Sequence, residues 1–485
     1  MTSGSGHPPR GADGKDDGAR DPRLPDAGSV ERAVLDAVDV DGLAAATREL
    51  VRIPSWGGDE TPAQEWMSRA MAAAGLDVDV WEIDLERLSR HPSYHAEIER
   101  DRALGVVGTR TGSGDQGRSL ILNGHVDVVP PGDRALWTHE PFGGAVVAGR
   151  IFGRGALDMK GPLLAGLYAL KALEDAGVDL AGTVHLESVV GEEDGGLGTL
   201  AALERGYRAD GAVVMEPTEE CVAPSQAGAL NFRVRVPGLA AHGAVRDEGV
   251  SAIENFIPVY RALQDLERRR NEALGDDPLF ATYAVPFAIC VGTIEGGDWA
   301  SSVPDHLSFE GRFGVAPGES VAEACRSLEE AVAAAARKDP WLRDHPPEVE
   351  WWGGRFDPAR TSPDHPLVRS MVAASELVAG DAGESTGTAA GEASIRSGSA
   401  ASGGGTSGTP HGAKPAQPPR PPGLRGMTYG ADMGLLVNQG KIPTVLYGPG
   451  DIRRAHRPDE YVEVDALVRV ARTLAVGMMR FCGVR

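Results

Sequence analysis

The sequence has few cysteines and no long apolar run, and both shortages limit where the protein can work. Its 485 residues include four cysteines with no Cys-Xaa-Xaa-Cys pair, so all four can be plain core or interface residues in a reducing compartment. No stretch of about 18 apolar residues occurs, which excludes a membrane-spanning helix. The N-terminal segment also lacks the apolar core of a signal peptide. We therefore expect a cytoplasmic protein.

Positive charge is scarce as well. The chain has 48 Lys and Arg residues against 70 Asp and Glu, which gives a net charge of −22 and a pI near 5.0. Phosphate backbones and anionic lipid surfaces repel such a chain, so neither nucleic acid nor a membrane is expected as its main partner. One hydrophobic core seldom serves a chain of this length, and two domains are expected.

The sequence does contain a stretch in which chemistry-bearing side chains follow a predicted strand. The apolar run 120–122 is short enough for a buried strand, and His125 and Asp127 come directly after it. Further on, Asp158 stands in a Gly-rich turn just before a helix with leucines at helical spacing. Open α/β sheets bind ligands at the carboxyl ends of their strands. This stretch therefore predicts a functional site at such an edge.

Three later segments repeat the pattern. GEEDGG at Gly191–Gly196 follows the strand-like TVHLESVV, and MEP at Met215–Pro217 follows DGAVV. The apolar IPTVLYG at Ile442–Gly448 leads into a loop that presents His456. Taken alone, His456 is more typical of a solvated or capping residue, and the acidic turn is more typical of a solvated surface. Taken together, the segments favour a metal site built from His, Asp and Glu.

These five blocks, in this order, resemble the M20 metallopeptidases, the family of acetylornithine deacetylase, succinyl-diaminopimelate desuccinylase and carboxypeptidase G2. The resemblance covers roughly residues 30 to 378 and 424 to 482. It implies an α/β fold in which a mixed-sheet, zinc-peptidase-like catalytic domain carries an inserted α+β (ferredoxin-like) lid and dimerisation domain. The alternation of predicted helices and strands indicates the same class.

The expected domain limits follow from composition and from the resemblance. Residues 1–28, which are polar and rich in Gly, Pro and charge, are expected to form a disordered tail. Residues 29–226 and 354–485 would form the two parts of the catalytic domain, with the lid at 227–353 between them. Within the second part, the Gly, Ser, Ala and Pro of residues 378–424 predict a flexible insertion.

By the resemblance, two divalent metal ions occupy the site, with zinc as the default and cobalt or manganese as replacements. Asp158 would bridge the two ions. His125 and Glu216 would complete the ligands of one ion, and Glu193 and His456 those of the other. Three ionised carboxylates and a bridging hydroxide match the charge of two such ions, so the site could be buried.

Three further residues are expected to act in catalysis. Glu192 would be the general base that deprotonates the bridging water and passes the proton to the leaving amine. Asp127 would accept the second ring N–H of His125 and so fix the tautomer presented to the metal. The resemblance assigns His242 to the tetrahedral oxyanion, which this histidine reaches in some members from the partner subunit.

The candidate substrate-binding residues are Arg312, Ser302 and Asp432. Arg312 lies where many members pair an Arg with a substrate carboxylate, and a strand-surface ion pair is the open alternative. Ser302 in SSVPD stands where the family usually has Asn. Asp432 in TYGADMG lies where relatives often have an Asp followed by Arg, but Met433 follows here. Structural and substrate-binding roles both stay open for Asp432.

The predicted function is that of a metal-dependent amidohydrolase that removes an acetyl, formyl or succinyl group from an N-acylated amino acid or related small molecule. HPSYHAEIER, NGHVDVVP, SSVPD with EGR, and YGADM are most similar to the acetylornithine-deacetylase-like subgroup, which includes deformylases of N-formyl aminopyrimidines. The alternatives are a metallo-dipeptidase or carboxypeptidase, a non-catalytic ligand-binding relative, and a serine hydrolase, for which no nucleophile elbow is apparent. A homodimer through the inserted domain is expected.

Overall fold

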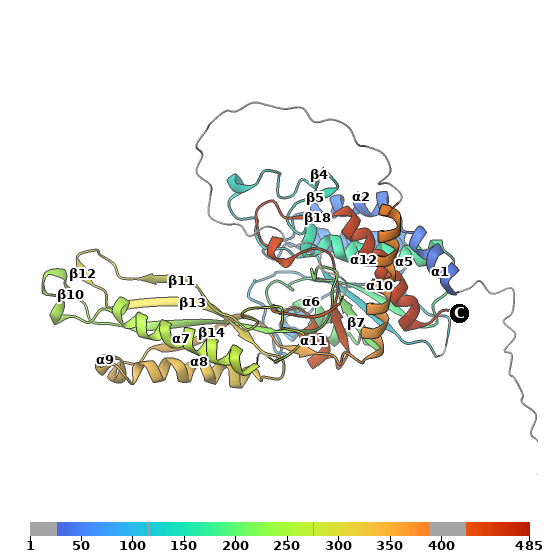
Figure 1. The fold of residues 1–485 in the computed structure, drawn as a ribbon. Coiled ribbons are helices and arrows are strands. Elements are labelled where there is room, and N and C mark those ends of the chain that lie inside the picture. The colour runs from blue at the N-terminus through green and yellow to red at the C-terminus, as the bar shows by residue number, and fades with distance from the viewer. Residues whose placement is uncertain (1–26, 115, 275, 388–422) are drawn as a thin grey trace, which may run out of the picture.

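The computed structural model describes residues 27–114, 116–274, 276–387 and 423–485. Figure 1 shows a body of helices around a sheet and an elongated module that projects from it. The module contains the elements from β9 (Gly228–Pro237) to β14 (Glu348–Phe356), and chain segments on both sides of it in the sequence build the body.

The body is built on a nine-stranded mixed sheet with the order β1-β2-β6-β3-β7-β17-β8-β15, in which β16 also pairs with β8. Its strands are β1 (Asp77–Glu82), β2 (Leu104–Arg110), β3 (Leu120–His125), β6 (Val184–Val189), β7 (Gly211–Val214), β8 (Val222–Gln226), β15 (Ala359–Arg360), β16 (Leu424–Met427) and β17 (Thr444–Leu446). The central strands β6, β3, β7 and β17 run parallel. Because parallel strands end at the same edge, the segments that follow these four strands meet there.

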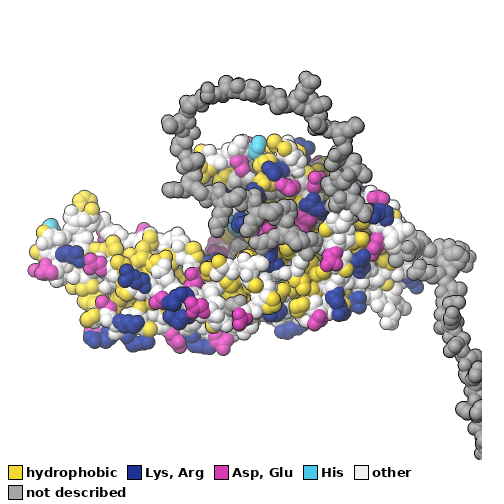
Figure 2. Space-filling model, in the orientation of Figure 1, with side chains coloured by type: hydrophobic (Ala, Val, Ile, Leu, Met, Phe, Trp, Pro, Cys, Tyr) yellow, Lys and Arg dark blue, Asp and Glu magenta, His cyan; other side chains and the backbone are white. Residues whose placement is uncertain are grey.

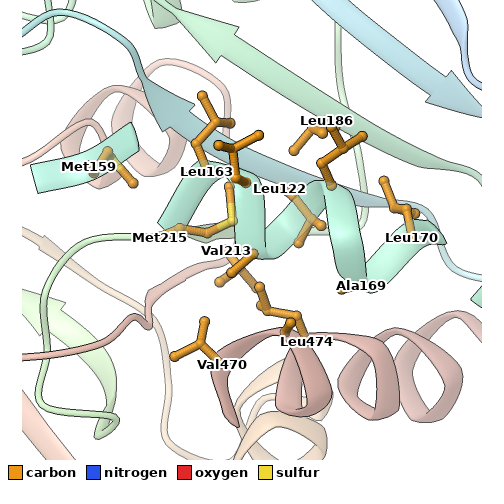
Figure 3. Close-up of a cluster of buried hydrophobic side chains, with 14 of the residues drawn as sticks. Leu122, Met159, Leu163, Ala169, Leu170, Leu186, Val213, Met215, Val470 and Leu474 are labelled. Atoms are coloured by element: carbon orange, nitrogen blue, oxygen red, sulfur yellow. The ribbon is translucent and has the colours of Figure 1, made fainter. Parts of the chain in front are cut away.

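Helices bury both faces of this sheet. On one face, α5 (Gly161–Asp175) and α12 (Val464–Cys482) pack against the sheet and against each other. Figure 3 shows their shared cluster: Leu122, Leu186 and Val213 from the strands, Leu163 and Leu170 from α5, and Val470 and Leu474 from α12. The alternate strand residues Ile121, Ala212 and Val214 pack on the other face, in a cluster that includes Leu203 of α6 (Leu197–Arg205) and Leu436 of α11 (Met433–Asn438). Successive side chains of a strand point to opposite faces, so these short apolar runs contribute to two cores at once.

The projecting module is a ferredoxin-like domain. Its strands and long helices follow the order β9, α7 (Ala252–Leu274), β11 (Ile289–Gly296), β13 (His306–Val315), α8 (Val321–Ala336) and β14. They form an antiparallel sheet ordered β11-β13-β9-β14. Alternate residues of β9, such as Phe232 and Val234, are buried in one core with Leu263 of α7 and Leu328 of α8. The expected insertion of an α+β module into a mixed-sheet domain is confirmed.

The remaining elements are short or peripheral. They are α1 (Ala27–Asp36), α2 (Val40–Val51), α3 (Thr61–Ala73), α4 (Leu85–Leu88), α9 (Pro340–Asp344), α10 (Pro366–Gly387), the strands β4 (Ala145–Val147), β5 (Arg150–Phe152), β10 (Ala241–His242), β12 (Ser302–Val303) and β18 (Tyr461–Glu463), and the single turns η1 (Arg134–Leu136), η2 (Ala156–Lys160), η3 (Gly243–Glu248) and η4 (Ile452–Arg454). In the part of the chain that the structure describes, no helix is long and apolar enough to cross a membrane.

One expected boundary is wrong. Residues 378–387, placed by composition in a flexible insertion, continue helix α10. Val378 is buried in a small cluster with Leu35 and Val476, and Asp381 forms an ion pair with Arg32. These tertiary contacts extend the helix beyond the point where composition alone would end it. Residues 388–422 of the expected insertion, and residues 1–26 of the expected tail, lie outside the described residues.

Candidate active site

The carboxyl edge of the four parallel strands gathers the side chains that the sequence singles out. His125 is the last residue of β3, and Glu192 and Glu193 lie in the turn between β6 and α6. Glu216 comes two residues after β7, and His456 lies in the segment between β17 and β18. Asp158 joins them from η2, in front of α5.

These residues form two clusters that share Asp158. His125, Asp158 and Glu216 have ligand atoms within 4.8 Å of one another, and so do Asp158, Glu193 and His456. One oxygen of Asp158, Oδ1, lies 3.3 Å from His125 Nε2, and the other, Oδ2, lies 3.4 Å from His456 Nε2. A carboxylate that presents one oxygen to each cluster has the geometry of a bridge between two cations. The ligand sets predicted from the sequence are thus brought together.

The charges of the site also fit divalent cations. Burial raises the pKa of Glu192 and of Glu216, and neighbouring carboxylates raise both further. Burial also raises the pKa of Glu193, and the nearby Asp158 adds to this shift. Such a gathering of buried acids is costly without positive charge among them. Imidazole and carboxylate donors suit zinc and related divalent ions, so the residues present fit the expected metal pair.

Glu192 stands beside the clusters and belongs to neither of them. Its side chain is buried, and its Oε2 lies 3.9 Å from His125 Nε2. It lines a cavity of about 450 Å³ together with Asp158, Glu193, Glu216 and His456. A carboxylate at this place can reach a water or a substrate atom near both clusters, as a general base must.

Asp127 makes a different contact from the one expected. His125 Nδ1 donates to the backbone oxygen of Asp127, at 2.8 Å, whereas the carboxylate of Asp127 lies 3.6 Å from that nitrogen. Asp127 Oδ2 instead accepts a hydrogen bond from the backbone N–H of Glu193, at 3.0 Å. The carboxylate is therefore engaged in holding the acidic turn, and the carbonyl of the same residue orients the imidazole.

A second carboxylate, which the sequence reasoning missed, holds the segment around Asp158. Glu460 Oε1 accepts hydrogen bonds from the backbone N–H groups of Leu157 and Asp158, at 3.1 and 3.2 Å. Its Oε2 accepts a bond of 2.6 Å from Arg154, whose side chain is as buried as that of Glu460. The only sequence signal for this pair was an acidic residue in RPDEYV close after His456.

A second group of buried charges, formed by Arg100, Asp194 and Glu60, supports the acidic turn. Arg100 donates to both oxygens of Asp194, at 2.8 and 2.9 Å, and to Glu60 Oε1, at 3.0 Å. Asp194 Oδ2 also accepts from the backbone N–H of Ile98. The residue that follows the expected ligand Glu193 is thereby fixed in the interior. Nothing in the sequence near Arg100 indicated this role.

The second domain and a late loop complete the wall of the cavity. Ala229, Asn231, Arg312, Gly354 and Phe356 come from strands β9, β13 and β14, and Glu97, Tyr429 and Gly430 come from loops of the body. Arg312 donates to the backbone oxygen of Thr428, at 3.1 Å, and no described carboxylate lies within ion-pair distance of it. Burial lowers the pKa of its guanidinium. A surface ion pair, the alternative for Arg312, is therefore not seen.

Three of the candidate residues do not line this cavity within one chain. His242 is on β10 and Ser302 is its pairing partner on β12, and Figure 1 shows both strands at the far end of the module. His242 is exposed, and its Nδ1 accepts from the backbone N–H of Ala244. Asp432 is buried and accepts a bond of 2.5 Å from Thr199. Burial raises the pKa of Asp432 to about 7.

The serine alternative needs a correction of detail. The letters G-x-S-x-G do occur, at Gly383–Gly387. These residues belong to helix α10, whereas a nucleophile elbow requires a sharp turn between a strand and a helix. The sequence motif is therefore present without the strand-turn-helix structure that a nucleophile elbow needs.

Known proteins give the same picture. Residues 121–416, more than half of the chain, match peptidase family M20/M25/M40. The chain is 29% identical over 441 residues to N-formyl-4-amino-5-aminomethyl-2-methylpyrimidine deformylase of Halalkalibacterium halodurans, covering 87% of this chain and 90% of that protein. It is 27% identical to the Bacillus subtilis enzyme of the same name, covering 86% and 89%. A probable succinyl-diaminopimelate desuccinylase of Staphylococcus aureus is 31% identical over 217 residues, 41% of this chain and 54% of that protein.

Solved structures agree on the fold. The dipeptidase Dug1p of Saccharomyces cerevisiae superimposes with a TM-score of 0.65 at 14% identity, over 93% of this chain and 98% of that one. Aminopeptidase PepT of Bacillus cereus gives 0.62 at 16% identity, over 92% and 99%. The chain therefore belongs to peptidase family M20/M25/M40 and, as the sequence predicts, it is a metal-dependent hydrolase of an amide C–N bond.

Proposed function

We propose that this protein removes an acyl group from the nitrogen of a small molecule, and that the acyl group is formyl and the amine an aminopyrimidine. The observation that carries the deacylase activity is the position of Glu192 beside two ligand clusters that share Asp158, all on one cavity. The similarity to two N-formyl aminopyrimidine deformylases over 86–87% of the chain supports the choice of substrate.

The metal ligands are part of this proposal. His125, Asp158 and Glu216 would hold one cation, and Asp158, Glu193 and His456 the other. Zinc suits these donors, and cobalt is the alternative. When bound, two such cations would lower the pKa of a water and polarise the acyl carbonyl.

Glu192 carries the proton in the reaction. Its carboxylate accepts a proton from the water that adds to the carbonyl carbon of the formamide. The C–N bond then breaks as Glu192 donates that proton to the leaving nitrogen, so that a free amine and formic acid result, and the acid loses its remaining proton to solvent as formate. In the metal-free protein, burial and the nearby Glu216 raise the pKa of Glu192.

The second domain suggests a homodimer, which we propose as the working form. Strand β11 is the outer strand of its sheet and exposes Ile294, and helix α7 exposes Ile253, Ile257 and Tyr260. Figure 2 shows apolar side chains at the surface along this module. An unpaired strand edge with exposed apolar residues is a surface for pairing with another chain. His242 of the partner subunit could then complete a cavity that His242 of the same chain does not reach.

A carboxylate-bearing substrate is the second candidate. Arg312 lines the cavity without a described acidic partner, and its planar guanidinium suits a carboxylate of the acyl group or of the amine side. This observation favours a desuccinylase or a metallo-dipeptidase.

The four cysteines form no disulfide, and a reducing compartment such as the cytoplasm is part of the proposal for either activity.

The experiment is an assay of amine release after the protein has been stripped of metal and reloaded with zinc or cobalt. Its substrates are the N-formyl aminopyrimidine, N-acetyl and N-succinyl amino acids, and a dipeptide. We expect turnover of the N-formyl compound that depends on reloading and falls away in Glu192→Gln. Turnover of the succinyl compound or the dipeptide alone would replace the formyl proposal by the second candidate. Binding of metal without any turnover would refute the deacylase proposal.

A further inference from the structure

Glu97 is a carboxylate on the cavity wall that the proposed reaction does not use. It lines the same cavity as Glu192 and Glu216 but belongs to the loop before β2, outside both ligand clusters. Its Oε1 accepts hydrogen bonds from the backbone N–H of Gly354 and, at 3.4 Å, from Asn231 Nδ2. No described residue donates to its Oε2, and no described Lys, Arg or His lies within ion-pair distance of it.

The neighbouring strand is shaped to receive this carboxylate. The pairing of β14 with β9 is interrupted between Trp352 and Phe356, and Gly353 there has a φ of +72°. A Cβ atom on Gly353 would collide with Glu97 Oε1 where that oxygen now lies, so the carboxylate would have to shift, and the positive φ itself disfavours any other residue. The glycine pair at 353–354 therefore makes room for the carboxylate and offers it an N–H.

The loop that carries Glu97 is fixed to the turn that carries the proposed base. The backbone N–H groups of Glu97 and Ile98 donate to the backbone oxygen and to Oδ2 of Asp194, at 3.2 and 2.8 Å. Asp194 in turn is held by Arg100. These hydrogen bonds set the position of the Glu97 backbone relative to the turn of Glu192, as the position of a specificity group needs to be set.

We propose that Glu97 determines the specificity for the amine side of the substrate by accepting a hydrogen bond from the amino group of its ring. This inference rests on the proposed deformylase function and deepens it. In a 4-aminopyrimidine the exocyclic amino group is an N–H donor, and a carboxylate oxygen such as Glu97 Oε2 is a strong acceptor for it. Phe356 and Tyr429 on the same wall offer aromatic surfaces to the ring. The cavity of about 450 Å³ suits a small molecule of this kind.

The alternative role of Glu97 is structural. Gly354 and Asn231 belong to the second domain, so their hydrogen bonds to Glu97 could serve only to hold the two domains together. Glu97→Gln separates the two roles. The amide oxygen of the new glutamine still accepts from Gly354 and Asn231, so the hydrogen bonds between the domains are kept, but the negative charge is lost. Glu99→Gln is the matched control, because it removes the same charge from the same loop at an exposed residue outside this cavity.

The test uses the metal-loaded full-length protein and two formamides. One is the N-formyl aminopyrimidine, and the other is N-formylbenzylamine, which has a ring of similar size without the amino group. We expect Glu97→Gln to lower kcat/KM for the pyrimidine on the order of 10- to 100-fold, mainly through KM, as the loss of a charge-assisted pair predicts. Activity on the benzylamine derivative should stay unchanged, as should both activities in Glu99→Gln. An equal fall for both substrates, or no fall, would overturn the inference.

Calorimetric binding of the free amine, 4-amino-5-aminomethyl-2-methylpyrimidine, separates this inference from the function on which it rests. We expect the wild type and Glu99→Gln to bind the amine and Glu97→Gln to bind it at least about 10-fold more weakly. If the wild type binds the amine through Glu97 but does not cleave its N-formyl derivative, the proposed function fails and the specificity role stands. If the wild type does not bind the amine, the specificity role is wrong.

Discussion

Replacing Arg100 by methionine tests whether the buried pair behind the acidic turn holds the site together. The side chains of Arg100, Glu60 and Asp194 are 1%, 2% and 5% exposed, so water does not screen their charges. Methionine keeps the length of the stem but leaves two buried carboxylates without their common partner. Breaking such a buried pair costs about 3–5 kcal/mol, and we expect the free energy of unfolding of Arg100→Met to fall by that amount.

The measurement is urea unfolding of the metal-loaded protein, followed by far-UV circular dichroism. Arg87→Met is the matched control, because Arg87 pairs with Glu204 at 3.2 Å while both side chains are largely exposed, at 72% and 40%. An exposed pair of this kind contributes less than about 1 kcal/mol. Equal effects of the two substitutions would refute the reasoning from burial.

A triple variant tests whether the unpaired carboxylates cause the loss of stability. If the cost arises from two stranded charges, the triple variant Glu60→Gln, Arg100→Met, Asp194→Asn should regain most of the lost stability, because neutral amides are cheaper to bury than carboxylates. Its activity should stay low, however, since the N–H of Ile98 and the turn of Glu192 lose the carboxylate that fixes them. A triple variant less stable than Arg100→Met would indicate that lost packing, and not charge, dominates.

Three further outcomes are expected. Glu192→Gln should lower kcat by about 10²- to 10⁴-fold while plasma emission spectrometry finds the wild-type metal content, and loss of metal would instead make Glu192 a ligand. Glu460→Gln should weaken metal affinity about 10- to 100-fold in a chelator competition, since Glu460 holds the backbone of Asp158; unchanged affinity would contradict this. Burial raises the pKa of Glu187 from 4.5 to about 7, so its contribution to the stability of the metal-free protein is fully present below pH 4.5 and is lost as the pH rises through 7. Up to about 3 kcal/mol of this pH dependence should disappear in Glu187→Gln, and a curve unchanged by the substitution would show that Glu187 does not titrate there.

The gathering of the proposed ligands at one edge of the sheet could be predicted because it depends on local patterns. His125 and Glu216 each follow a short apolar run, and a run of that kind, buried on both faces, predicts a parallel strand whose end lies at a common edge. The order of the segments along the chain then implied that the side chains would meet. The details of contact did not follow, since no pattern indicated that Asp127 would bond His125 through its carbonyl and Glu193 through its carboxylate.

The supporting pairs could not be predicted because their members lie far apart in the sequence. Arg154 is separated from Glu460 by 306 residues, and Arg100 from Asp194 by 94. Each of these residues alone reads as an ordinary surface charge, and only the packed fold removes it from water. The same holds for Glu97, whose neighbour Gly354 belongs to another domain and lies 257 residues away.

Buried carboxylates that accept backbone N–H groups explain part of the residue choice around the site. Two of the segments that carry a proposed ligand are held by a buried carboxylate that accepts a backbone N–H: Glu460 for Asp158, and Asp127 for Glu193. A carboxylate is a strong acceptor for an N–H group, but another negative charge near four acidic side chains needs compensation. For Glu460 the guanidinium of Arg154 supplies it. The positive charge thus lies behind the carboxylates that orient the ligands, where it stabilises the turns without occupying the space between the two histidines that the cations would fill.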